Sequence, residues 1–236
     1  MLLAATAFVS AQTAKPAAKA SVEDTIKARV EQRFGATVNS VKLMPFGLYE
    51  VTIGTEIAYA DKEAAHLFIG RVIDTNTKED LTQARRDDLL KVDYRSLPFD
   101  QAVKVVRGDG SRQMAVFADP NCPYCKKFEK DLANMKNVTI YTFLYPILSQ
   151  DSFERARGIW CAKDRAAAWN DQMLDGKTPP PAPADCKHPL QQNLALGQKL
   201  EVTGTPTIFF TDGRRLPGAV GADRIEAGLA RAAGKK

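Results

Sequence analysis

The chain has no run of 18 consecutive apolar residues, and a membrane-spanning helix needs about that many. Its 33 Lys and Arg residues do not gather in a stripe, so nucleic acid is a poor candidate for a partner. Histidine is scarce, since His66 and His188 are the two copies and they are isolated. The remaining composition, 44% hydrophobic and 26% charged over 236 residues, is ordinary for a globular protein with one large or two small domains.

Cysteine is also scarce, but its four copies are the most informative residues. An even number suits an oxidising compartment. Two of them lie in the segment Cys-Pro-Tyr-Cys at residues 122–125, between a predicted buried strand at 114–118 and a predicted helix at 125–135. The helix has an apolar face formed by Phe128, Leu132 and Met135. Two cysteines in this arrangement predict a reversible dithiol–disulfide pair.

The two cysteines are predicted to have different roles. Proline is favoured at the first helical position, and Pro123 there makes Cys122 the N-cap residue. A thiolate at the N-cap accepts the free backbone N–H groups of Tyr124 and Cys125 and lies at the positive end of the helix dipole. Both effects predict a lowered pKa for Cys122, in the range of roughly 3.5–7.5 against about 8.5 for a free thiol. We therefore predict that Cys122 attacks a substrate disulfide and that Cys125, more deeply buried, resolves the mixed disulfide.

Other interpretations of this segment stay open at this point. Half of a zinc site would need a second close Cys or His pair, whereas Cys161 and Cys186 lie far apart in the sequence. A purely structural disulfide, or two unrelated buried thiols, would also account for the residues. The redox interpretation is preferred, and neither a metal nor an organic cofactor is predicted.

A second signal comes from residues 202–210, where Thr205 and Pro206 precede a β-branched and aromatic run. Proline within such a run is restricted to the first residue of the strand or to an edge strand. In thioredoxin-like proteins this proline is cis and faces the Cys-x-x-Cys pair, which would leave the backbone of Thr205 free to pair with a substrate beside Cys122. An ordinary trans turn before a strand is the alternative.

Three segments together resemble the family of periplasmic disulfide isomerases that includes DsbC and DsbG. They are Phe-Ala-Asp-Pro-Asn-Cys-Pro-Tyr-Cys at residues 117–125, Ile-Trp-Cys-Ala-Lys-Asp at residues 159–164 and Gly-Thr-Pro at residues 204–206. The resemblance covers about residues 21–232 and implies a homodimer. In that family an N-terminal domain forms the dimer, and the active site lies in a thioredoxin-like domain.

The second pair of cysteines helps to place the chain within this family. Pro-Tyr between the active cysteines is similar to the DsbG branch, whereas Cys161 and Cys186 are similar to the DsbC branch, which has a structural disulfide there. The chain is therefore identified as closer to DsbC. Closing a ring of about 26 residues should stabilise the fold by roughly 3–3.5 kcal/mol in the chain-entropy model. A structural role is preferred over a second redox centre, because neither cysteine has a Cys-x-x-Cys partner.

The N-terminal segments indicate export. Residues 1–11 resemble the end of a secretory signal peptide, with a small-residue cleavage site before Gln12. The basic region that normally begins such a peptide is missing, so either the true translation start lies upstream or the segment is a short apolar tail. Residues 12–20, rich in Ala, Lys and Pro, are predicted to be a disordered leader. Together with the resemblance, these features predict a periplasmic location.

Residues 21–76 are predicted to form the N-terminal dimerisation domain, an α+β unit. Ser21 and Asp24 form a capping-box variant before a helix that ends at Gly35. Strand-like segments follow at residues 38–44, 48–53, 56–60 and 67–73. The edges of so small a sheet would be exposed in a monomer, and pairing between two copies would cover them. Packing on a neighbouring domain is the alternative.

Residues 77–95 are predicted to be a linker helix, because the segment is polar nearly all round. Thr77 and Asp80 would form its capping pair. The remaining residues, 96–236, are predicted to be an α/β thioredoxin-like catalytic domain with a helical insert at residues 151–200.

Two pairings are predicted within the catalytic domain. Gly-Asp-Gly at residues 108–110 is typical of a hairpin, here between strands at 102–106 and 114–118. The strand at 138–145 should pair in parallel with the strand at 114–118, because a helix connects them.

The sequence thus predicts an enzyme, a homodimeric thiol–disulfide isomerase or reductase that reshuffles incorrect disulfides in secreted proteins. The resemblance implies a membrane-bound thiol reductant as a second partner. Two alternatives remain: a monomeric thiol oxidase, against which residues 21–75 count because an oxidase needs no N-terminal domain, and a chaperone-like binding protein with secondary redox activity.

Overall fold

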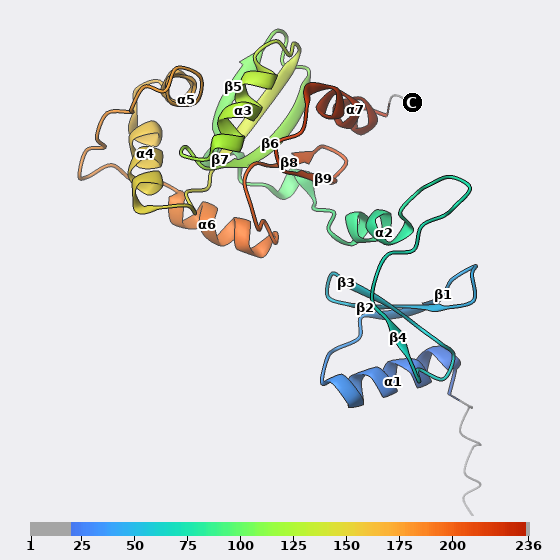
Figure 1. The fold of residues 1–236 in the computed structure, drawn as a ribbon. Helices are drawn as coiled ribbons and strands as arrows, with labels where there is room; N and C mark the ends of the chain where they lie inside the picture. The colour runs from blue at the N-terminus through green and yellow to red at the C-terminus, as the bar shows by residue number, and fades with distance from the viewer. Residues whose placement is uncertain (1–19, 235–236) are drawn as a thin grey trace, which may run out of the picture. The chain divides into compact units, whose positions relative to one another are not determined.

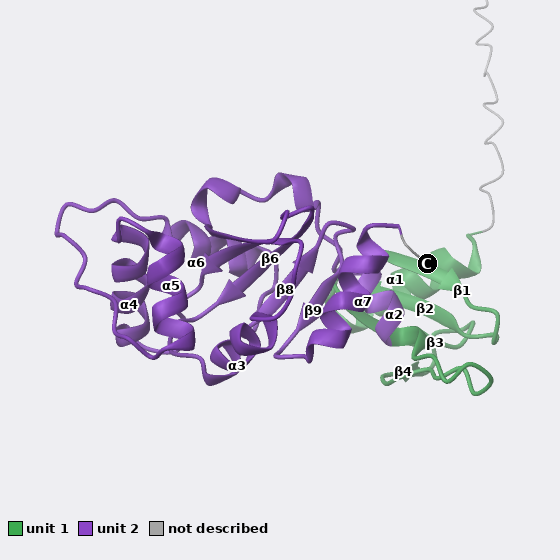
Figure 2. Cartoon of the chain, turned by 90° about the horizontal axis from the view of Figure 1, so that it is seen from above, with its two compact units in different colours: residues 1–82 green, residues 83–236 purple. Residues whose placement is uncertain are grey.

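The computed structural model of the protein describes residues 20–234 and divides the chain into two compact units, residues 1–82 and 83–236 (Figures 1 and 2). The predicted signal-peptide segment, residues 1–11, lies outside the described residues, as does the predicted leader apart from Ala20. Over the described residues, no helix is both long enough and apolar enough to cross a membrane.

The first unit begins with helix α1 (Val22–Phe34), whose two ends are fixed as the sequence predicted. Ser21 Oγ accepts the N–H of Asp24 at 3.0 Å, and the Asp24 carboxylate accepts the N–H of Ser21 at 3.2 Å, which completes the capping box. Gly35 ends the helix in the left-handed region with φ 64°, where glycine carries no steric penalty. The buried face of α1 consists of Ile26 and Val30.

Four antiparallel strands follow in the order β1-β2-β3-β4. They are β1 (Ser40–Leu43), β2 (Tyr49–Ile53), β3 (Glu56–Ala60) and β4 (Leu67–Phe68). The prediction of a strand over residues 67–73 was wrong in length. Val72 and Ile73 pair instead with the segment that enters the next helix: the Leu81 N–H donates to the Val72 carbonyl at 2.9 Å, and Ile73 forms a β-bridge with Asp80.

Helix α2 (Leu81–Leu89) is shorter than the predicted linker helix, and the prediction that Thr77 caps it was wrong. A tight turn occupies the preceding residues, because the Asp74 side chain accepts the N–H groups of Asn76 and Thr77 at 2.8 and 3.1 Å. Lys78 lies in the left-handed region with φ 62°, which interrupts any right-handed helix. The helix therefore begins after this turn.

The second unit is built on a five-stranded sheet in the order β5-β7-β6-β8-β9. Its strands are β5 (Val103–Arg107), β6 (Arg112–Ala118), β7 (Val138–Leu144), β8 (Thr207–Phe210) and β9 (Arg215–Pro217). Strands β6 and β7 are parallel, which confirms that prediction, and the other neighbours are antiparallel.

The predicted hairpin between β5 and β6 was wrong, because β7 lies between these two strands and pairs with both. The connection passes tightly over the start of β7. Gly108 and Gly110 have φ of 62° and 66°, and a Cβ at either position would lie 2.5–2.8 Å from Asn137 or Thr139. The two glycines thus allow a close crossing rather than a two-stranded turn.

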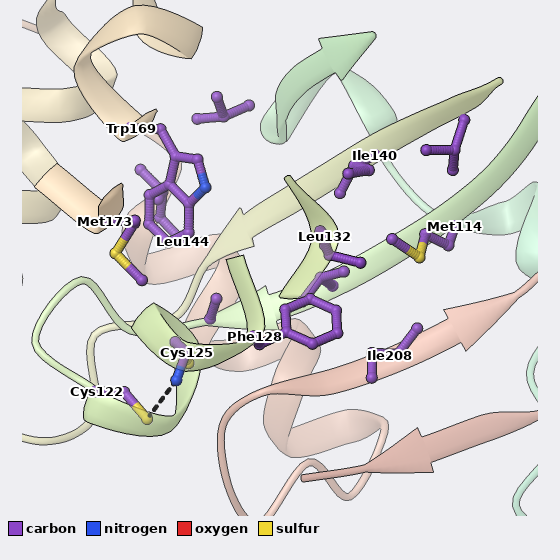
Figure 3. Packing of buried hydrophobic residues seen from close by; sticks show 14 of the residues in the cluster. Met114, Cys122, Cys125, Phe128, Leu132, Ile140, Leu144, Trp169, Met173 and Ile208 are labelled. Carbon is purple, nitrogen blue, oxygen red and sulfur yellow. Dashed lines mark hydrogen bonds between the residues drawn. The ribbon is translucent and has the colours of Figure 1, made fainter. Parts of the chain in front are cut away.

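Helices cover the sheet of the second unit, and its core occupies both faces (Figure 1). The helices are α3 (Pro123–Leu132), α4 (Gln150–Cys161), α5 (Arg165–Leu174), α6 (Leu190–Lys199) and α7 (Ala222–Ala232). Successive side chains of a strand point to opposite faces, and β6 follows this rule. Met114 and Val116 belong to one buried cluster with Phe128 of α3 and Trp169 of α5, whereas Phe117 belongs to an aromatic cluster on the other face. Figure 3 shows Met114, Phe128 and Trp169 of the first cluster.

Candidate active site

Cys122 lies at the N-cap of α3, directly after β6, and Pro123 occupies the first turn as predicted. Its side chain is buried, and Cys122 Sγ accepts the backbone N–H of Cys125 at 3.4 Å (Figure 3). The thiol of Cys122 also donates to the backbone carbonyl of Thr205 at 3.3 Å. The helix start and the Thr205 segment therefore hold one sulfur atom between them.

Cys125 lies one helical turn further on, is fully buried and, like Cys122, is a free thiol. Burial raises the pKa of Cys125 well above that of an ordinary thiol, and a negative charge on Cys122 raises it further. Hydrogen bonds to the Asp119 backbone and to the Thr205 side chain act in the opposite direction but are weaker. Cys125 therefore stays protonated at neutral pH unless a reacting group removes its proton.

The segment before β8 completes the site. The Thr205–Pro206 peptide bond is cis, as the sequence pattern predicted, and Pro206 is buried. The Thr207 hydroxyl donates to the Gly204 carbonyl at 2.8 Å, and the Gly218 N–H donates to the Pro206 carbonyl at 2.8 Å, so the segment is held on both sides. The structure thus brings the Cys122–Cys125 pair together with Thr205, which lies 83 residues after Cys122 in the sequence.

Sequence reasoning assigned no role to the loop that precedes Cys122, and the structure shows that this loop is tied down by buried polar groups. The carboxylate of Asp119 is fully buried and accepts the N–H of Asn121 at 2.8 Å. The Asp119 carbonyl accepts the N–H of Cys122 at 3.1 Å. Gln172 of α5 donates to the Pro120 carbonyl at 3.0 Å. An acidic residue directly after an entirely apolar strand was the sequence signal for Asp119.

A second polar group that sequence reasoning missed lies inside α3. Glu129 is buried, and it accepts hydrogen bonds from Trp169 Nε1 at 2.9 Å and from Arg107 Nη2 at 3.4 Å. Burial raises the pKa of Glu129, and the hydrogen bond from Trp169 and the charge of Arg107 offset part of that rise. The only signal in the sequence was a Glu four residues after Cys125, next to the predicted apolar face.

Cys161 and Cys186 form a disulfide, which joins the end of α4 to the loop before α6. The bridge closes a ring of the chain that contains α5, and this helix supplies Trp169 to the core and Gln172 to the loop before Cys122. His66 and His188 lie in other surroundings: His66 Nδ1 contacts the Asp61 carboxylate at 2.8 Å, and the ring of His188 packs edge-on against Phe153. Over the described residues, no group of three or more His, Cys, Asp or Glu side chains is arranged to hold a metal ion.

A Cys-x-x-Cys pair at the start of the helix after a central strand, beside a cis-proline segment, defines a thioredoxin-like thiol–disulfide oxidoreductase. Comparison with known proteins agrees with this class. Residues 99–233 match the family model of a thioredoxin-like domain, and residues 10–83 match that of the disulfide bond isomerase protein N-terminal domain.

The chain belongs to the DsbC family of thiol:disulfide interchange proteins. It is 49% identical over 221 residues to the probable thiol:disulfide interchange protein DsbC of Bordetella pertussis, which covers 93% of this chain and 77% of the relative. It is 36% identical over 109 residues to DsbC of Escherichia coli K12, over 44% of this chain and 45% of the relative. The crystal structure of a disulfide interchange protein from Neisseria gonorrhoeae superimposes with a TM-score of 0.52 at 37% identity, covering 57% of this chain and 97% of that one.

The pH dependence of alkylation should separate the two active-site cysteines. We expect iodoacetamide to modify Cys122 in the reduced protein at a much lower pH than Cys125, because the raised pKa of Cys125 keeps it in the unreactive thiol form until the solution is strongly alkaline. Peptide mass spectrometry across a pH series measures both profiles. Their midpoints are compared rather than their amplitudes, since burial slows both reactions. Equal midpoints near about 8.5 would contradict the assignment.

The disulfide should stabilise the fold without taking part in catalysis. We expect the double variant Cys161→Ala/Cys186→Ala to unfold with a free energy lower by about 2–5 kcal/mol and to retain disulfide reductase activity. Denaturant unfolding measures the first result and turnover of a disulfide client the second. Unfolding the wild-type protein in strong reductant is the control, and it should remove the difference from the variant. A folded variant without activity would show that the bridge carries electrons.

Proposed function

We propose that this protein is a periplasmic homodimer that isomerises and reduces incorrect disulfides in secreted proteins, with Cys122 as the nucleophile and Cys125 as the resolving thiol. The single observation that supports this most is the placement of Cys122 Sγ. It lies at the start of α3, accepts a backbone N–H of that helix and touches the Thr205 carbonyl. A thiolate there is stabilised by the helix terminus, and a client segment beside Thr205 would bring its disulfide to the same sulfur atom.

The chemistry begins when the Cys122 thiolate attacks one sulfur of a client disulfide. The client S–S bond breaks, a Cys122–client bond forms, and the second client sulfur leaves as a thiolate. In isomerisation, a client thiolate then attacks elsewhere and finally displaces Cys122, so the client keeps its number of disulfides and the enzyme stays reduced. In reduction, Cys125 gives up its proton and displaces the client. The client gains two electrons, and Cys122 and Cys125 become a disulfide.

The raised pKa of Cys125 supports isomerisation as the main outcome. At neutral pH Cys125 is a thiol, and the thiol form does not attack the mixed disulfide. The client thus stays attached to Cys122 for longer, and its own thiols have more time to exchange. When reduction does occur, an external thiol reductant must return the pair to the dithiol, and the family resemblance points to a membrane-bound protein for that step.

The first unit supports the proposal of a dimer. The sheet edge formed by β4 exposes apolar side chains, with Phe68 51% and the adjacent Ile69 87% exposed. An apolar sheet edge left open in this way is a site for pairing with another strand. We place the dimerisation domain at residues 21–76, the linker at residues 77–95 and the catalytic domain at residues 96–236, and we assign the β4 edge as the surface where two copies pair.

Scrambled ribonuclease tests the proposed function against its alternatives. The reduced protein should restore ribonuclease activity from fully oxidised, scrambled material in catalytic amounts. A thiol oxidase would instead act on reduced ribonuclease and leave the scrambled form unchanged. If the protein were mainly a chaperone, the Cys122→Ala/Cys125→Ala variant would suppress light scattering of a refolding client as well as the wild-type protein does. Neither protein would then reshuffle the disulfides of the client. Either of these two results would replace the isomerase proposal.

A further inference from the structure

The peptide unit that joins Pro120 to Asn121, directly before Cys122, is held at both ends by buried side chains. Its carbonyl accepts a hydrogen bond from Gln172 Nε2 at 3.0 Å, and its N–H donates to the Asp119 carboxylate at 2.8 Å. The second oxygen of Asp119 accepts two backbone N–H groups of the loop after β7 at 2.9 and 3.0 Å. The backbone that leads into the nucleophile is therefore fixed by groups outside α3.

An arginine of α4 fixes the orientation of the Gln172 amide. Gln172 Oε1 accepts a hydrogen bond from Arg155 Nη1 at 3.1 Å. An arginine side chain can only donate and a backbone carbonyl can only accept, so an amide, which has one group of each kind, is suited to join them. Three residues earlier on α5, Trp169 Nε1 donates to Glu129 of α3 at 2.9 Å. Helix α5 thus holds both α3 and the loop before it.

The same arginine closes a second connection to this loop. Arg155 Nε donates to Asp151, one turn earlier on α4, at 2.6 Å, and Asp151 accepts Asn121 Nδ2 at 2.7 Å. The hydrogen bonds from Arg155 and Asn121 lower the pKa of Asp151 below its ordinary value, so it stays an ionised acceptor. The contacts form a closed hydrogen-bonded ring, which runs through Pro120, Gln172, Arg155, Asp151 and Asn121.

The position of this backbone matters because Cys122 Sγ lies between two groups of opposite character. The N–H of Cys125 is 3.4 Å away and the carbonyl oxygen of Thr205 is 3.3 Å away. A thiolate is attracted by the N–H at the start of the helix and repelled by the carbonyl oxygen. The reactivity of the sulfur therefore depends on where the preceding backbone holds it between them.

We propose that Asp151, Arg155 and Gln172 are positioning residues, which hold the backbone before Cys122 so that the sulfur keeps its place at the start of α3. This inference rests on the proposed function, because it takes Cys122 as the nucleophile. It also gives the helical insert a part in the chemistry, since all three side chains come from α4 and α5. They act through the loop backbone rather than on the sulfur directly.

Alkylation of Cys122 across a pH series tests the proposal. Arg155→Met removes the donor groups that hold Gln172 and Asp151, and Gln172→Met removes the hydrogen bond to Pro120 with little change in volume. We expect either substitution to raise the pH midpoint of iodoacetamide modification of Cys122 by about one unit, a part of the roughly 1–5 units by which helix starts and nearby cations lower thiol pKa values. Peptide mass spectrometry of the reduced, full-length protein measures the midpoint, and denaturant unfolding shows that each variant is folded.

Arg157→Met is the matched control. Arg157 lies on the same helix, and its side chain is 21% exposed against 25% for Arg155. It donates to Glu154 at 3.1 Å and to the Pro183 carbonyl at 3.4 Å, so both of these partners lie within the insert. This variant removes the same charge from α4 and leaves the hydrogen-bonded ring whole. Its midpoint for Cys122 should stay at the wild-type value.

Three results would count against these assignments. Midpoints for Cys122 that stay at the wild-type value in Arg155→Met and Gln172→Met would overturn the proposal. An equal rise in Arg157→Met would also overturn it, because the lost charge would then be the cause. Should the buried substitution Gln172→Met fail to fold, Arg155→Met decides the question alone. A wild-type midpoint near about 8.5 would instead count against the proposed function itself, whatever the variants show.

Discussion

Replacing Cys122 with alanine should abolish disulfide chemistry and lower reduction of an insulin-like client by at least about a thousandfold, the order of loss expected when a nucleophile is removed. Cys122 is the sulfur that the start of α3 and Thr205 hold together, and over the described residues the remaining free cysteine is Cys125. Cys125 is fully buried and protonated at neutral pH, so it should not replace the missing nucleophile. Turnover in the presence of excess dithiothreitol measures the effect.

Cys125→Ala is the matched comparison, because it removes the other sulfur of the pair and leaves the helix start unchanged. Reduction should again fall sharply, since no thiol displaces the client from Cys122. Isomerisation of scrambled ribonuclease should survive in part, because the client's own thiols can complete the exchange. If Cys122→Ala retained more activity than Cys125→Ala, the roles assigned to the two cysteines would have to be exchanged.

Removing the first unit should separate reduction from isomerisation. We expect a truncated protein that begins at Thr77 to be monomeric, to reduce disulfides at the rate of the full chain, and to lose isomerase activity by about tenfold or more. Two linked binding modules raise apparent affinity by about 10²–10⁴ without any new contact. A single catalytic unit would therefore release a client before its bridges have been tried in turn.

The structure determines where this truncation has to begin. The Val92 N–H donates to the Gly213 carbonyl at 3.0 Å, and Tyr94 is buried in the core of the second unit, so cutting at residue 95 would damage the catalytic fold. Beginning at Thr77 keeps α2 whole. Size-exclusion chromatography with light scattering gives the oligomeric state. The single variant Ile69→Lys, at the exposed sheet edge, is the control that should break the dimer without shortening the chain. Full isomerase activity in a monomer would rule out the dimeric mechanism.

Local chemistry explains why much of the site could be predicted from the sequence. Pro123 fixes the helix start, so Cys122 has to be the N-cap, and both assignments depend on residues next to each other in the chain. The continuous apolar run at residues 114–118 and the Pro206 pattern likewise predicted a buried strand and the segment beside the cysteines. The capping box at Ser21 was correct for the same reason.

Predictions that depended on distant partners were less successful. Gly108 and Gly110 indicate a tight turn, but a glycine pattern does not show whether another strand enters between the two that it connects. The start of α2 was placed too early, because the turn formed by Asp74 and the left-handed Lys78 competes with the helix for the same residues. The role of Asp119 depends on backbone groups that lie 28 and 29 residues away, so its position after an apolar strand marked the residue but did not identify its partners.

The most direct test of the account is to isolate the covalent complex between the Cys125→Ala variant and a scrambled client. Mass spectrometry after acid quenching and proteolysis identifies the cysteine to which the client is attached. We expect the client on Cys122, with the Cys161–Cys186 disulfide intact in the same molecules. A complex attached to Cys161 or Cys186, or the absence of any complex with a variant that still isomerises the client, would contradict the account.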